Sequence, residues 1–107
     1  MTVALSDATV ALQTETRNIS ASGFYCTLER FIPPMTKLQL EMELPSNARR
    51  HRIRCTGVVV RTEPTVANPE HGAFNVAVFF TDLAERDRAS IAQFVRDRLS
   101  NASTSSD

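Results

Sequence analysis

The chain has 107 residues, of which 42% are apolar, and its twelve acidic residues balance twelve basic ones. This length and composition predict one water-soluble globular domain, and they exclude a collagen-like chain, a disordered chain and a nucleotide-fold enzyme with a separate substrate domain. The balanced charge excludes a global field that would attract the protein to nucleic acid or anionic lipid.

Alternation of apolar and polar residues with a period of two runs through the first three quarters of the chain and predicts strands. The clearest case is Lys37 to Glu43, where every second residue is apolar. Arg52 to Thr62 is longer, and Gly57 followed by three valines indicates a bend at which both faces become covered. The other predicted strands are Val10 to Thr16, Phe24 to Leu28 and Ala73 to Phe80.

The connections are short and rich in Pro, Gly and polar residues, so they favour antiparallel pairing over helical crossovers. A single helix follows the strands, with Thr81 or Asp82 as its cap and an apolar stripe that ends at Leu99. We therefore predict a mainly β protein, a small antiparallel barrel of five to six strands with one C-terminal α-helix. It would comprise an N-terminal segment (1–7), the barrel with its helix (8–99) and a disordered tail (100–107).

The sequence contains no candidate residues for enzyme catalysis. The two histidines, His51 and His71, and the two cysteines lack the spacing of a metal site, and no phosphate loop or nucleophile elbow is present. We predict no catalytic residue, no metal and no cofactor. Cys26 and Cys55 are expected to pack as small apolar residues in the reducing cytoplasm, because no secretory signal or membrane-spanning stretch is seen.

The segment from Thr16 to Gly23 joins two predicted strands and carries polar groups suited to a ligand. Asn18 offers a carboxamide, Ser20 a hydroxyl, and Gly23 lets another group approach the backbone. Arg17, next to Asn18, offers a guanidinium for a phosphate or a guanine edge. Two interpretations stay open: a turn that only folds the hairpin, and a ligand site.

Asn18-x-Ser20-x-x-Gly23 resembles the D/N-x-S-x-x-G motif of the PilZ domain family, and the order of strands and final helix is similar over Val10 to Leu99. The resemblance implies a bacterial signal transduction module that binds the nucleotide cyclic di-GMP and relays it to motility, exopolysaccharide or pilus machinery. It places Asn18 and Ser20 against a guanine or its ribose-phosphate, and Gly23 where the barrel allows close approach. Arg17 would be a further phosphate or guanine contact.

Ligand-binding members of the family also carry an R-x-x-x-R motif before the first strand, whereas the first sixteen residues here contain no Arg or Lys. A charge-assisted hydrogen bond contributes about 1.5 to 3 kcal/mol, so two absent arginines weaken binding by about two to four decades. Arg17 and Arg61 are the nearest substitutes. The alternative function is a degenerate PilZ domain that does not bind the nucleotide and acts as a protein–protein adaptor.

Eleven of the twelve basic residues are Arg, and five of them lie between Arg49 and Arg61 without an acidic residue. We interpret Arg49 to Arg54 as a solvated turn that leads into a strand, with Arg52 and Arg54 on its wet face. A nucleic-acid surface and a docking patch for an acidic protein are the alternatives. The expected partners are cyclic di-GMP and a protein effector, without nucleic acid or membrane insertion.

Overall fold

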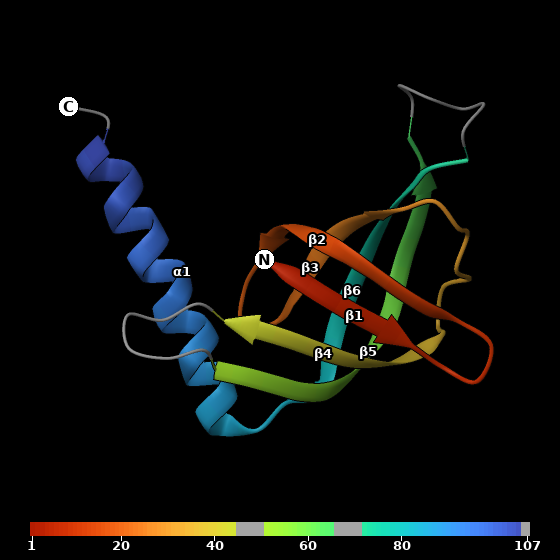
Figure 1. Cartoon of the computed structure of the whole chain (residues 1–107), viewed down its shortest axis with the longest axis horizontal. Helices are drawn as coiled ribbons and strands as arrows, with labels where there is room; N and C mark the ends of the chain where they lie inside the picture. Colours follow the sequence, from red (N-terminus) through yellow and green to blue (C-terminus); the bar gives the residue numbers. More distant parts are fainter. Residues whose placement is uncertain (45–50, 66–71, 106–107) are drawn as a thin grey trace.

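The computed structural model describes residues 1–44, 51–65 and 72–105, with side chains up to residue 98 in the helix. The strands pair antiparallel in the order β1-β2-β3-β6-β5-β4 and close into a barrel, as predicted. Figure 1 shows helix α1 beside one end of this barrel, with its C-terminal part extending away from the strands. The elements are β1 (Thr2–Ser6), β2 (Ala11–Ile19), β3 (Gly23–Leu28), β4 (Lys37–Leu44), β5 (His51–Pro64), β6 (Phe74–Asp82) and α1 (Glu85–Ser105).

The barrel interior is the hydrophobic core, and it contains the inward half of each alternating strand. Leu38, Leu40 and Met42 are at most 2% exposed, as the alternation in this segment predicted. Cys26 and Cys55 are free and buried in the same core. Burial raises the pKa of both thiols to about 11, so both remain protonated near neutral pH and pack as small apolar groups.

The N-terminal segment predicted for residues 1–7 is instead the first barrel strand. β1 pairs with β2 on one side and with β4 on the other, and it closes the barrel between them. Val3 and Leu5 are fully buried in the core. Two alternating apolar residues are too short a pattern to identify a strand from sequence. This strand depends on its pairing with β2 and β4, which the local sequence does not show.

Helix α1 differs from the prediction at both of its ends. Thr81 and Asp82 belong to β6, so neither caps the helix, and the first turn closes on the carbonyl of Ala84. At the other end the helix continues to Ser105, so the tail predicted from residue 100 is helical as far as the structure describes it. A helix that is already nucleated extends at small cost through Ser, Asn and Thr, whose helix propensities are only moderately low.

Apolar and polar contacts attach α1 to the barrel, and Phe94 and Val95 pack against its core. Ile91 is fully buried, and Asp87 Oδ1 lies 2.9 Å from Nε2 of His51 at the start of β5. Arg88 donates to the carbonyl oxygen of Ala21 at 2.7 Å, which ties the helix to the turn between β2 and β3. In the described part of the chain, no helix has both the length and the apolar character needed to cross a membrane.

Candidate functional site

A β-bulge in β2 places two consecutive side chains on the outer face of the barrel. Thr16 pairs with Cys26 and Asn18 pairs with Tyr25, so Arg17 is an extra residue between the two pairs. Arg17 and Asn18 are both exposed, although simple alternation would bury one of them. The bulge therefore brings a guanidinium and a carboxamide to the same spot on the surface.

A second bulge has the same effect in β5. Val59 pairs with Val78 and Arg61 pairs with Ala77, which leaves Val60 as the extra residue. Val60 and Arg61 both lie on the outer face, and Val60 is 41% exposed. The prediction that both faces of this strand become covered after Gly57 is therefore wrong at Val60, because the bulge turns its side chain to solvent.

The two bulges bring residues from four neighbouring strands into one row on the outer face. Along this row Asn18 pairs with Tyr25, Tyr25 with Ala77, and Ala77 with Arg61. Ala77 is short, and a hollow of about 380 Å³, here called the central hollow, lies over it. Tyr25 and Phe79 line the central hollow and are 46% and 53% exposed, so two aromatic rings face solvent there.

The turn from Ser20 to Gly23 is held by its own hydrogen bonds. The backbone N–H of Ser20 donates to the carbonyl of Gly23 at 2.9 Å, and that of Ser22 donates to Oγ of Ser20 at 3.2 Å. The hydroxyl of Ser20 also lies 3.5 Å from the Gly23 carbonyl. Ser20 therefore has the turn-forming role that one interpretation of the sequence gave it, while it also lines the central hollow.

Gly23 is required by the packing of the barrel itself. A Cβ at this position would lie 2.1 Å from the carbonyl oxygen of Val78 and 3.1 Å from Cα of Phe79. The backbone of β6 therefore occupies the space that a side chain would need. The close approach that the sequence predicted at Gly23 is an approach between two strands of the barrel.

The structure brings three of the four predicted site residues to the central hollow, namely Asn18, Ser20 and Gly23. Arg17 lies beside it and lines two neighbouring hollows together with Asn18. Its terminal nitrogen Nη1 lies 3.4 Å from both Thr27 Oγ1 and Asn75 Oδ1. Among the described residues, the carboxamide of Asn18 has no hydrogen-bond partner, so it is available to a ligand.

Most residues that line the central hollow were not assigned to a site from the sequence, namely Ser22, Phe24, Tyr25, Val60, Ala77, Val78 and Phe79. One signal was present: Phe79 falls on the polar side of its strand, in phase with Asn75. The bulge at Val60 had no signal, because a register shift depends on the partner strand. Arg61, named as a substitute for the absent arginines, does line the central hollow and lies 3.6 Å from Glu63 Oε1.

The arginine-rich segment at the start of β5 is engaged in ion pairs. Arg52 and Arg54 are exposed, as predicted for a wet strand face, and both contact the carboxylate of Glu41, at 3.4 and 3.6 Å. Arg49 and Arg50 lie outside the described residues, as does His71. The described part of this segment therefore presents paired charges and no free cluster of cations.

Comparisons with known proteins relate this fold to one family. The sequence matches the family described as "PilZ domain" over residues 1–97. Among solved structures, the inhibitor of motility MotI/DgrA of Bacillus subtilis superposes with a TM-score of 0.79 at 20% identity. The match covers 92% of this chain and 47% of that one, so this chain spans about half the length of its structural neighbour. No curated protein matches the sequence at a significant level.

Proposed function

This chain belongs to the PilZ domain family, and we propose that it is a bacterial signalling module that binds cyclic di-GMP in the central hollow and relays it to a protein effector. Domains of this family are regulatory binding modules, which agrees with the prediction that the chain is not an enzyme. The proposal includes a cytoplasmic location, where such a nucleotide would be met, and an effector in motility, exopolysaccharide or pilus machinery.

The observation that carries the proposal is the position of the motif at the central hollow. Asn18 has an unoccupied carboxamide at one end of the residue row, and Tyr25 stands next to it with its ring half exposed. A carboxamide pairs with the donor and acceptor edge of a purine, and an exposed aromatic ring provides a face on which the purine stacks. Phe79 provides a second such face in the same hollow.

The charge around the hollow suits an anionic ligand. Arg61 is at the other end of the row, and Arg17 is beside Asn18 in the β2 bulge. A guanidinium binds a phosphate or a guanine edge with two parallel hydrogen bonds. These two residues supply cations on the face where the motif lies, although no Arg or Lys occurs among residues 1–16.

Calorimetric titration with cyclic di-GMP tests the proposal. We expect saturable binding that becomes at least about tenfold weaker in Asn18→Ala and in Tyr25→Ala, since each removes about 1.4 kcal/mol or more of contact. Gln39→Ala is the matched control, because Gln39 is an exposed strand residue on the opposite wall. The absence of heat up to roughly 1 mM ligand, where the binding free energy is about −4 kcal/mol, would contradict nucleotide binding.

A second function is favoured by one observation. Tyr25, Val60 and Phe79 form an exposed apolar surface at the central hollow, and aromatic residues of this kind are enriched in protein interfaces. The chain would then act as a ligand-independent adaptor. Three results would distinguish this adaptor function from nucleotide binding. The effector complex would form without nucleotide, remain unchanged in Asn18→Ala and be lost in Phe79→Asp.

A further inference from the structure

A second hollow lies between β2 and helix α1. Its volume is about 210 Å³, and its lining includes Arg17 and Asn18 from the β2 bulge and Arg98 from the helix. We call it the helix hollow. Asn18 also lines the central hollow, so the two hollows share this residue. This shared residue motivates the question whether one ligand occupies both hollows.

The two arginines of the helix hollow lack acidic partners. Among the described residues, neither Arg17 nor Arg98 forms an ion pair, and no residue that lines the hollow is acidic. Both contacts of Arg17 use Nη1, which they hold toward Thr27 on β3 and Asn75 on β6. In the part of the chain that the structure describes, its other N–H groups have no partner. The guanidinium of Arg98 lies 5.4 Å from the centre of the Phe94 ring, and this contact orients it without neutralising it.

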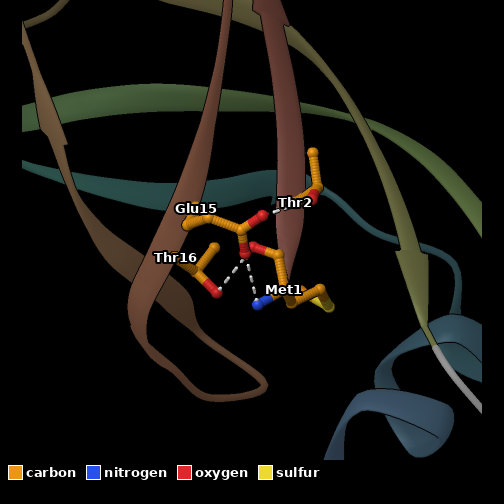
Figure 2. Close-up of polar contacts among 4 residues, drawn as sticks. All are labelled: Met1, Thr2, Glu15 and Thr16. Atoms are coloured by element: carbon orange, nitrogen blue, oxygen red, sulfur yellow. Dashed lines mark hydrogen bonds and ion pairs between the residues drawn. The ribbon is translucent and has the colours of Figure 1, made fainter.

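Two further charged groups at the edge of the helix hollow, the amino group of Met1 and the carboxylate of Glu15, form an ion pair. Figure 2 shows the carboxylate of Glu15 between the hydroxyl of Thr2 and the amino group of Met1, which lies 3.0 Å from Oε2. The hydroxyl of Thr16 donates to the carbonyl oxygen of Met1 at 3.2 Å, which fixes this wall of the hollow. The hydrogen bond from Thr2 is the largest cause that lowers the pKa of Glu15, so this carboxylate is fully ionised near neutral pH. The amino group and Glu15 thus compensate each other, and the positive charges of Arg17 and Arg98 remain.

The other hollow beside Asn18 has a different charge balance. It is lined by Arg17 and Arg61, but Glu63 lines it too and lies 3.6 Å from Arg61. A phosphate placed there would compete with Glu63 and be repelled by it. Among the hollows next to Asn18, the helix hollow therefore combines two guanidinium groups with no carboxylate.

We propose that Arg17 and Arg98 bind a phosphate group in the helix hollow, with the carboxamide of Asn18 as an additional donor. Two guanidinium groups that repel each other are stabilised together by an anion between them, and each offers a planar fork of donors to phosphate oxygens. If the proposed function holds, this phosphate belongs to cyclic di-GMP, and a base of the same ligand occupies the central hollow. The anion site itself does not depend on it.

The test compares Arg98→Gln with Arg96→Gln. Each variant removes one positive charge from the same helix two positions apart, but Arg96 donates to Gln93 at 2.8 Å and does not line the hollow. Binding of cyclic di-GMP is measured by calorimetry, and binding of inorganic pyrophosphate by phosphorus NMR titration, both at low and high salt. We expect Arg98→Gln to weaken both probes at least tenfold and to reduce the salt dependence, while Arg96→Gln stays within about twofold of the original protein.

The two probes separate failure of the anion site from failure of the proposed function. Equal weakening in both variants means a general charge effect and overturns the site, as does unchanged binding in Arg98→Gln. If the chain binds pyrophosphate through Arg98 but does not bind cyclic di-GMP, the anion site stands and the proposed function fails. If neither probe binds, both proposals fail. Circular dichroism checks the fold of each variant, which we expect to be unchanged because both arginines are exposed.

Discussion

The two walls of the barrel differ in regularity. β4 pairs with the first half of β5 without a register shift, from Lys37 opposite Val58 to Leu44 opposite His51. This regular wall presents its outward side chains one at a time, and the carboxylate of Glu41 forms ion pairs with both of its arginines, Arg52 and Arg54. The bulged wall, formed by β2, β3, β6 and the second half of β5, contains the bulges at Arg17 and Val60. The pairing of β5 with β6 also shifts between Thr56 and Gly57, away from these two bulges.

The comparison shows how an ordinary strand pattern produces a site. A bulge gives up one ladder pairing and directs two consecutive side chains to the same face. Two bulges on either side of β3 and β6 therefore gather Arg17, Asn18, Val60 and Arg61 around Tyr25 and Ala77. The regular wall has as many arginines, and both are ion-paired, as is Arg61 of the bulged wall. Among the described residues, Arg17 in the first bulge has no such partner. Irregular pairing, and not the number of arginines, thus separates the candidate site from the rest of the surface.

The largest expected effect comes from Gly23→Ala, which changes the contact between β3 and β6 in the bulged wall. The new methyl group would lie 2.1 Å from a backbone oxygen of β6, so two backbones must separate. We expect a loss of roughly 3 kcal/mol or more in the free energy of unfolding, measured by chemical denaturation, because backbone atoms cannot rotate away.

Gly72→Ala is the matched control for this substitution. Gly72 has a φ of 62°, and a Cβ there would meet no atom within 4 Å. Only the cost of left-handed backbone remains, about 1 kcal/mol. If both variants lose the same stability, the packing of β3 against β6 is not the reason that position 23 needs glycine.

Deletion of Val60 tests whether the second bulge is a functional device. Val59 and Arg61 already pair with consecutive residues of β6, so joining them gives uninterrupted alternation with every side chain on its present face. We expect the deleted chain to fold with a change of about 1 kcal/mol or less, and to bind cyclic di-GMP more weakly. Thermal unfolding and calorimetric titration measure the two effects.

Deletion of Val58 is the comparison for that experiment. Val58 is paired with Lys37 on one side and with Phe79 on the other, so it is not an extra residue. Its loss would turn the fully buried Val59 toward solvent and shift the register of β5 against β4. A chain that tolerates the loss of Val58 as well as that of Val60 would show that β5 has no fixed register here.

Glu41→Gln perturbs the regular wall and should have a smaller effect. It removes the partner of Arg52 and Arg54, whose side chains are 57% and 72% exposed. Solvent screens such pairs, so we expect less than about 1 kcal/mol of destabilisation, and less again at high salt. Denaturation at two salt concentrations measures this, and ligand binding at the bulged wall should not change. Altered binding would mean that the two walls are coupled.

The sequence predicts the regular parts of the molecule better than the irregular ones. Alternation predicted five of the strands, and the motif predicted a turn at Ser20, because both depend on neighbouring residues. Val60 is exposed and Arg17 is left without a pairing partner on β3. Both facts depend on the register of partner strands, which neighbouring residues do not determine. Arg98 comes near Asn18 only because α1 packs beside β2. Ligand contact by Asn18 and Arg17 stays a prediction.

The smallest effect concerns Glu15, at the edge of the helix hollow. The hydrogen bond from Thr2 and the contact with the amino group lower its pKa below the ordinary value of 4.5. A carboxylate with a lower pKa in the folded state stabilises the protein above that ordinary value, and this contribution is lost as the pH falls through the folded pKa. Glu15→Gln should therefore reduce the acid dependence of stability between about pH 5 and pH 3, as measured by denaturation at a series of pH values.

The same variant links the pH dependence to the anion site. Without the carboxylate of Glu15, the amino group of Met1 is uncompensated beside Arg17 and Arg98, so pyrophosphate should bind slightly more tightly, by about twofold at low salt. Asp7→Asn is the control, because the pKa of Asp7 is also lowered, chiefly by the backbone of Thr9, but Asp7 does not line the helix hollow. A matching gain in Asp7→Asn would mean that overall charge, and not the arginines of the helix hollow, determines the affinity for the anion.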